Sequence, residues 1–156
     1  MNAHDIEFAR LDGSPLPLAA FKGRSILLVN VASACGFTPQ YGPMQAMAEE
    51  FGDTGPAIIG IPCNDFGAQE PGSSETISDF CETRFGVSFP VAEKVAILDA
   101  SSRHPFYQWI AAQLGEDALP KWNFHKFVVG PEGELVASFG SRTAPNADEV
   151  KAALGV

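Results

Sequence analysis

The sequence is poor in cysteine, in basic residues and in long apolar runs. Its 156 residues include 3 Cys and 10 Lys or Arg against 19 Asp or Glu, which gives a net charge of −9. Three widely spaced cysteines exclude a small secreted disulfide scaffold. The acidic balance, without any basic cluster, excludes nucleic acid or an anionic membrane as the main partner. No apolar run approaches the ~20 residues of a membrane span, so no stable membrane insertion is expected.

Targeting and modular features are also absent. The stretch 1–9 carries Asp5 and Glu7 and has no long apolar core, so the sequence predicts no signal peptide and a cytoplasmic location. We find no repeat, low-complexity tract or linker. With 46% hydrophobic and 19% charged residues, the chain has an ordinary globular composition. A single domain spanning 1–156 is therefore expected.

The most informative stretch that is present runs from a buried strand to a cysteine. Ile26–Val31 is a continuous apolar run of the length of a strand buried on both faces. Small residues follow, so Cys35 falls at the carboxyl edge of a sheet. Pro39 permits a helix to begin there, with Thr38 as its cap. Free N–H groups at a helix N-terminus favour a thiolate, although a packed, unreactive thiol is equally compatible with this stretch alone.

Apolar periodicity and turn residues predict the other elements. In chain order we expect a hairpin over Phe8–Leu18 turned at Asp12-Gly13, the strand Ile26–Val31, a helix over Pro39–Phe51, a strand over Ala57–Pro62, a helix over Glu75–Phe85 capped by Ser74, extended segments at Phe89–Val91 and Val95–Leu98, a helix over His104–Leu114, strands at Phe127–Val129 and Leu135–Phe139, and a helix over Ala147–Leu154 capped by Asn146. This alternation predicts an α/β fold around a mixed sheet, with an N-terminal β-hairpin.

Two further segments carry neutral hydrogen-bond donors toward the edge where Cys35 is expected. Gln69 follows the strand Ala57–Pro62, and Trp122 and Asn123 precede the late hairpin. The loops at the carboxyl ends of strands converge on one edge of such a sheet. An amide or indole N–H aimed at sulfur stabilises a thiolate without adding a competing base. Each residue alone is equally well explained by a turn or by the core.

Three motifs now identify a family. They are Asn30-Val31-Ala32-Ser33-Ala34-Cys35-Gly36-Phe37-Thr38-Pro39-Gln40-Tyr41, Pro62-Cys63-Asn64-Asp65-Phe66-Gly67-Ala68-Gln69-Glu70-Pro71-Gly72 and Trp122-Asn123-Phe124-His125-Lys126-Phe127. In this order they make the chain similar, along nearly its whole length, to the glutathione peroxidase family of thiol peroxidases. The resemblance implies a thioredoxin-like fold, with a central mixed sheet flanked by helices.

The resemblance also implies roles for five residues and requires no cofactor or metal. Cys35 stands at the peroxidatic position, where some relatives carry selenocysteine. Gln69, Trp122 and Asn123 form the hydrogen-bonding set around its sulfur. Cys81 matches the resolving cysteine of the members that use thioredoxin.

Other positions fit the family less simply. Cys63 lies in a family motif but outside the catalytic pair, so we expect a buried thiol. Asp65 replaces a neutral amide of many relatives and is expected to face solvent, since a carboxylate beside Cys35 would oppose thiolate formation. Ser138–Arg142 is less basic than the corresponding segment of relatives, which weakens the case for a dedicated glutathione site. No long insertion separates Leu114 from Trp122, which in this family indicates a monomer.

The expected function is a thiol peroxidase that reduces hydrogen peroxide and organic or lipid hydroperoxides. Cys35 would become a sulfenic acid, Cys81 would convert it to a disulfide, and thioredoxin would reduce that disulfide. Glutathione as the reductant stays open, as does a peroxide-sensing module that passes its disulfide to a partner. A non-catalytic thioredoxin-like domain is a third alternative. A zinc site is disfavoured because the chain has no C-x-x-C pair.

Overall fold

The computed structural model describes residues 2–156. The strands are β1 (Glu7–Ala9), β2 (Pro15–Pro17), β3 (Ile26–Val31), β4 (Ala57–Pro62), β5 (Lys126–Val129) and β6 (Leu135–Phe139), and the α-helices are α1 (Tyr41–Phe51), α2 (Ser74–Phe85), α3 (Pro105–Leu114) and α4 (Asp148–Leu154). The four-stranded sheet has the order β4-β3-β5-β6. β3 pairs parallel with β4 and antiparallel with β5, so the predicted mixed sheet is confirmed. β1 and β2 form the predicted N-terminal hairpin.

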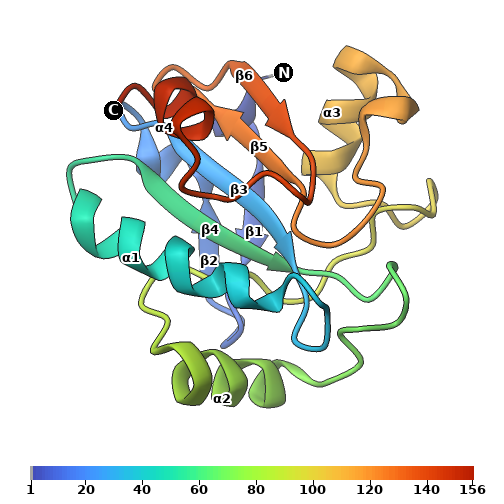
Figure 1. Ribbon diagram of the computed structural model, residues 1–156. Coiled ribbons are helices and arrows are strands. Elements are labelled where there is room, and N and C mark those ends of the chain that lie inside the picture. Colours follow the sequence, from blue (N-terminus) through green and yellow to red (C-terminus); the bar gives the residue numbers. More distant parts are fainter. Residues whose placement is uncertain (1) are drawn as a thin grey trace.

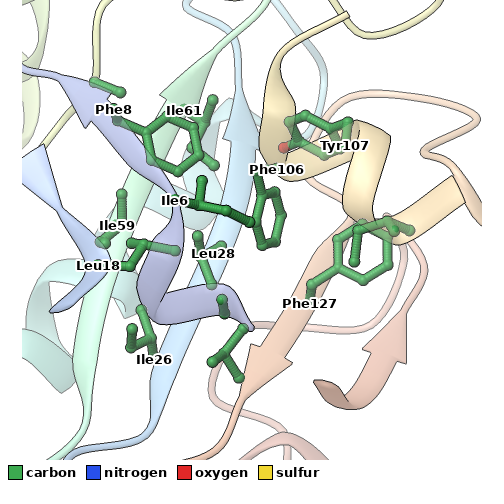
Figure 2. Packing of buried hydrophobic residues seen from close by; sticks show 14 of the residues in the cluster. Ile6, Phe8, Leu18, Ile26, Leu28, Ile59, Ile61, Phe106, Tyr107 and Phe127 are labelled. Carbon is green, nitrogen blue, oxygen red and sulfur yellow. The ribbon is translucent and has the colours of Figure 1, made fainter. Parts of the chain in front are cut away.

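The two faces of the sheet build two hydrophobic clusters, because successive side chains of a strand point to opposite faces. Leu27, Val29 and Val31 of β3 face a cluster that includes buried residues of α1, α2 and α4. Ile26 and Leu28 face a second cluster with the N-terminal hairpin and α3. Figure 1 shows α1 and α4 in front of the sheet and the hairpin behind it, and Figure 2 shows the second cluster from close by.

The central strands form as their sequences predict. β3 and β4 have the expected bounds, and every residue of both is buried. Apolar side chains on both faces favour this placement, since each face is covered by other elements. The expected strand at Phe127–Val129 begins one residue earlier, at Lys126. The carboxyl ends of β3 and β4 lie together because the two strands are parallel and in register from Ile26 and Ala57 to Val31 and Pro62.

The caps of two helices were predicted wrongly. α2 is capped by Ser73, whose hydroxyl accepts the N–H of Thr76 at 3.2 Å, and not by Ser74. α4 begins at Asp148 without a side-chain cap, so Asn146 does not cap it. The extended segments at Phe89–Val91 and Val95–Leu98 take part in isolated β-bridges through Val91 and Ala96. In the described part of the chain, every helix is too short or too polar to cross a membrane.

His104 starts α3 and ties this helix to the hairpin. Its Nδ1 accepts the N–H of Phe106 at 3.1 Å, and its ring stacks on Phe8 with 4.1 Å between centroids. Burial lowers the pKa of His104 from 6.5 to about 4. A neutral imidazole is needed here, because a protonated Nδ1 cannot accept the capping hydrogen bond.

We predict that the folded state loses stability as the pH falls from 6.5 to about 4. In that window unfolded His104 binds a proton and folded His104 does not, so protons favour unfolding by up to about 3 kcal/mol. His104→Asn keeps a capping side chain and removes this titration. Urea unfolding across the window should therefore show a shallower pH dependence for the variant, and parallel curves for the two proteins would contradict the prediction.

Candidate active site

Cys35 lies in the turn that follows β3, at the carboxyl edge of the sheet, as predicted. Its residue is 8% exposed. The hydroxyl of Thr38 accepts the N–H of Cys35 at 2.9 Å and donates to the carbonyl of Ala32 at 2.8 Å. Thr38 thus closes the turn around Cys35 and does not cap α1 as expected. A 3-10 helix over Thr38–Gln40 follows the turn, and α1 begins only at Tyr41.

The sulfur of Cys35 is itself hydrogen-bonded. The backbone N–H of Phe37 donates to its Sγ, with 3.3 Å between the nitrogen and the sulfur. An N–H that points at sulfur stabilises negative charge on it. The sulfur therefore lies near a backbone N–H group, as predicted. This group belongs to Phe37 in the turn and not to the N-terminus of α1.

The loop that follows β4 is bonded directly to this turn. The N–H of Ala34 donates to the carbonyl of Gln69 at 3.1 Å. The N–H of Ser33 donates to Oε1 of Glu70 at 3.2 Å, and Glu70 is only 1% exposed. Burial raises the pKa of Glu70, while its hydrogen bonds from Ser33 act in the opposite direction. Gln69 and Glu70 therefore fix the position of the residues that precede Cys35.

The third segment is held by an amide inside β3. Asn30 is fully buried, its Nδ2 donates to the carbonyl of Trp122 at 3.0 Å, and its Oδ1 accepts the N–H of His125 at 3.1 Å. Its carbonyl accepts the N–H of Phe124 at 2.6 Å. Phe124 has a φ of 63°, which is uncommon for a residue other than glycine. Asn30 thus anchors the segment that carries the two predicted donors.

Gln69 and Asn123 meet side chain to side chain. Nδ2 of the buried Asn123 donates to Oε1 of Gln69 at 3.0 Å and to the carbonyl of Phe66 at 3.2 Å. Because the oxygen of the Gln69 amide is occupied, its NH2 group is left to donate elsewhere. Within residues 2–156, neither of these side chains nor that of Trp122 donates a hydrogen bond to Sγ of Cys35.

Trp122 covers the neighbouring loop and remains 36% exposed. Its ring meets Phe66 edge-on at 6.3 Å between centroids. It also lies over Gly67, where an added Cβ would come within 2.7 Å of Cη2 of the indole. Beside it is an open cavity of about 450 Å³ whose apolar lining includes Leu98 and Leu119. The structure therefore places Trp122 between the Gln69 loop and an accessible, partly apolar hollow.

The three cysteines are free, buried and divided between the two faces of the sheet. Cys35 and Cys81 belong to the cluster on the α1 and α2 face, and Cys63 belongs to the opposite cluster. Burial raises the pKa of Cys63 to about 12. It also raises the pKa of Cys81, which lies on α2 as predicted and donates its S–H to Oη of Tyr41 at 3.6 Å. Cys63 is thus a buried thiol, as expected.

Asp65 is exposed and is bonded to a neighbouring loop. Its Oδ2 accepts the N–H groups of Ile97 at 2.7 Å and Leu98 at 3.0 Å. The carboxylate therefore holds the segment at 97–98. The expectation that Asp65 faces solvent is confirmed.

Four residues that organise the site were not predicted to do so: Asn30, Thr38 in its observed role, Glu70 and Lys126. Lys126 is fully buried, and its Nζ donates to the carbonyls of Gly140 at 3.3 Å and Ser141 at 3.1 Å. Burial lowers its pKa to about 7. The signal that would have found Asn30 and Lys126 is a polar residue within an otherwise apolar strand, since such a group must find buried partners.

The chain is similar in sequence to known peroxidases. A sequence model of the family described as glutathione peroxidase matches residues 3–111. The chain is 47% identical over 150 residues to the hydroperoxy fatty acid reductase gpx1 of Synechocystis, covering 91% of this chain and 87% of that protein. It is 43% identical over 137 residues to the glutathione peroxidase-like peroxiredoxin gpx1 of Schizosaccharomyces pombe, covering 86% and 85%.

Solved structures of related proteins have the same fold as this chain. The crystal structure of Trgpx in apo form superposes with a TM-score of 0.73 at 30% identity, covering 100% of this chain and 97% of that one. A thioredoxin-family thiol:disulfide interchange protein of Chlorobium tepidum gives 0.65 at 19% identity, covering 99% and 98%. The second likeness concerns the fold alone, and it confirms the predicted thioredoxin-like architecture.

We predict that Gly67→Ala displaces the ring of Trp122. The new Cβ would lie 2.7 Å from the indole, a contact that must be relieved by movement of one of the two groups. Stopped-flow measurement should show oxidation of Cys35 by hydrogen peroxide slowed about tenfold, the effect of losing one aligned donor or contact. The indole signal in near-ultraviolet circular dichroism should change with it.

Gly155→Ala is the matched control. Gly155 is left-handed, with a φ of 82° against 70° for Gly67, but an added Cβ meets no atom within 4 Å. Both variants carry the strain of a left-handed alanine, which costs about 1 kcal/mol or more. Equal losses of Cys35 reactivity in the two variants would show that strain, and not Trp122, is responsible.

Proposed function

The chain belongs to the glutathione peroxidase family and is a peroxidase, and on that premise we propose that Cys35 is its peroxidatic residue. The observation that carries this proposal is the hydrogen bond from the N–H of Phe37 to Sγ, at 3.3 Å, in a turn to which the Gln69 loop is also bonded. The Cys35 thiolate attacks the terminal oxygen of a hydroperoxide. The O–O bond breaks, an alcohol or water leaves, and the sulfur becomes a sulfenic acid.

Stabilising the thiolate would by itself accelerate the attack on peroxide only slightly. For a cysteine in general, lowering the thiol pKa from ~8.5 to ~6.5 raises the thiolate fraction at neutral pH about 25-fold. The accompanying loss of nucleophilicity is roughly eightfold, so about a threefold gain remains. We therefore assign to Gln69, Trp122 and Asn123 the stabilisation of charge on the departing oxygen. Gln69 is bonded to the turn through Ala34, Asn123 is bonded to the Gln69 side chain, and Trp122 precedes Asn123, which supports that role.

We predict that Trp122→Phe slows the peroxide step at least tenfold while changing the thiolate population much less. Phenylalanine keeps an aromatic ring over Gly67 and removes the indole N–H. The measurement is stopped-flow oxidation of Cys35 with a thiolate titration of the same protein. Trp109→Phe removes the other indole, which lies in the opposite cluster, and should leave the rate unchanged. Proportional losses of rate and of thiolate in Trp122→Phe would contradict the assignment.

Cys81 is the resolving cysteine in this proposal. It shares a face of the sheet with Cys35, whereas Cys63 lies across the sheet. Cys81 is buried in α2, so the disulfide requires that helix to loosen. The resulting disulfide between mobile segments suits reduction by thioredoxin. Glutathione as the reductant and a sensor that turns over only once are the competing functions.

We predict that Cys81→Ser retains one rapid reduction of peroxide but loses multiple turnover with thioredoxin. Cys63→Ser is the matched control and should retain both. Mass spectrometry after one equivalent of peroxide should show a Cys35–Cys81 disulfide in the unmodified protein. Equal turnover of the two variants, or efficient turnover of Cys81→Ser with glutathione alone, would favour the glutathione-recycled enzyme.

The substrates include bulky hydroperoxides in our proposal. One relative is named a hydroperoxy fatty acid reductase, and the hollow of about 450 Å³ beside Trp122 here is lined in part by Phe66, Leu98 and Leu119. The apolar part of this hollow, beside Trp122, is the surface that we propose for the acyl chain of such a substrate.

A further inference from the structure

Helix α2 packs against Tyr41 through several of its side chains. Ile77 and Cys81 are the fully buried residues of this helix. The ring of Tyr41 stacks on Phe85 at 5.3 Å between centroids and meets Phe80 edge-on at 6.3 Å. The S–H of Cys81 donates to Oη of Tyr41 at 3.6 Å. Three side chains on the inner side of α2 therefore converge on Tyr41.

Tyr41 is itself held firmly from the other side. It is fully buried and is the first residue of α1, six positions after Cys35. Its ring lies edge-on to Phe124 at 5.7 Å and stacks on Phe89 at 6.3 Å. Phe124 belongs to the segment that Asn30 anchors. Tyr41 thus joins α2 to the helix that follows Cys35 and to the segment that carries Trp122 and Asn123, and Figure 1 shows α2 lying at the border of the fold beside α1.

We propose that Tyr41 is a positioning residue that retains Cys81 in the folded helix until Cys35 has been oxidised. The inference rests on the proposed function, in which Cys81 forms a disulfide with Cys35. Burial, above all, and the nearby carboxylate of Glu70 raise the pKa of Cys81, whereas its hydrogen bond with Tyr41 acts in the opposite direction. Tyr41 therefore acts by retaining the side chain in the folded helix, and a thiol that is buried there is a poor nucleophile. Resolution therefore begins with separation of Cys81 from Tyr41.

A cavity that Cys81 itself lines offers room for that separation. It has a volume of about 370 Å³ and lies between α2 and the turn at Arg10–Asp12, with Val87 and Phe89 also in its lining. α2 ends at Gly86, whose φ of 58° is left-handed. The helix can therefore shift or lose its last turn toward this cavity without displacing the sheet.

The reaction that follows balances without another reagent. The Cys81 thiol, once released, attacks Sγ of the Cys35 sulfenic acid. The new S–S bond forms as the S–O bond breaks, and the hydroxyl leaves as water with the proton of Cys81. Both electrons that the peroxide gained have then come from the two sulfurs. Retention of Cys81 delays this step but does not alter the oxidation of Cys35.

Tyr41→Phe tests the inference because it removes Oη and keeps the ring that contacts Phe80, Phe85 and Phe124. In the reduced protein, alkylation of Cys81 by iodoacetamide should become about threefold to tenfold faster, the effect of one weak hydrogen bond. Rapid-quench mass spectrometry should show the Cys35–Cys81 disulfide forming faster by a similar factor. Oxidation of Cys35 to the sulfenic acid should keep its rate, and less sulfinic acid should form in excess peroxide.

Tyr107→Phe is the matched control. Tyr107 is the other fully buried tyrosine, it lies in the cluster that contains Cys63, and its Oη has no hydrogen-bond partner within residues 2–156. This variant removes the same atom on the opposite face of the sheet, so it should leave Cys81 alkylation and disulfide formation unchanged. A merely structural effect of losing a buried hydroxyl would appear in both variants.

Two readouts separate this inference from the function on which it rests. Unchanged or slower alkylation of Cys81 in Tyr41→Phe overturns the retaining role of Tyr41, whatever disulfide forms. Absence of a Cys35–Cys81 disulfide in the unmodified protein overturns the assignment of Cys81 as the resolving residue, and faster alkylation in the variant would still support retention by Tyr41. Equal acceleration by Tyr41→Phe and Tyr107→Phe also overturns the inference.

Discussion

The site depends on one buried amide. Asn30 interrupts the apolar strand β3, and its side chain and carbonyl bond to Trp122, Phe124 and His125. Leaving a buried amide without hydrogen-bond partners would cost about 1–3 kcal/mol per group. Conformations in which these bonds are broken are therefore disfavoured. Because the same strand leads directly into Cys35, the cysteine turn and the Trp122 segment take their positions from a common element.

A second set of bonds fixes the remaining loop against the same turn. Ser33 and Ala34 donate their N–H groups to Glu70 and Gln69, and Asn123 donates to the Gln69 side chain. Three segments that are far apart in sequence are thereby linked to one another through hydrogen bonds. In the proposed function, this arrangement fixes the donors before any peroxide arrives, the condition under which donors stabilise developing charge most effectively. In contrast, the contacts of α2 with Tyr41 are ring contacts and one S–H bond.

Much of this architecture could be predicted from the sequence. The bounds of β3 and β4, the placement of Cys81 on a helix and the family resemblance were all confirmed, because continuous apolar runs and long motifs leave few alternatives. Local choices were less predictable. Ser73 and not Ser74 caps α2, since either hydroxyl could serve. The polarity of Asn30 shows that it needs buried partners, but only the three-dimensional pairing shows which groups supply them.

The position of Cys63 has a consequence for the oxidised protein. Three cysteines permit three intramolecular disulfides. Two of these pairings involve Cys63, which faces the cluster behind the sheet while Cys35 and Cys81 face the one in front. Cys63 therefore packs in a different part of the core from the other two thiols. In the proposed cycle, this separation favours the Cys35–Cys81 pairing over the two pairings that involve Cys63.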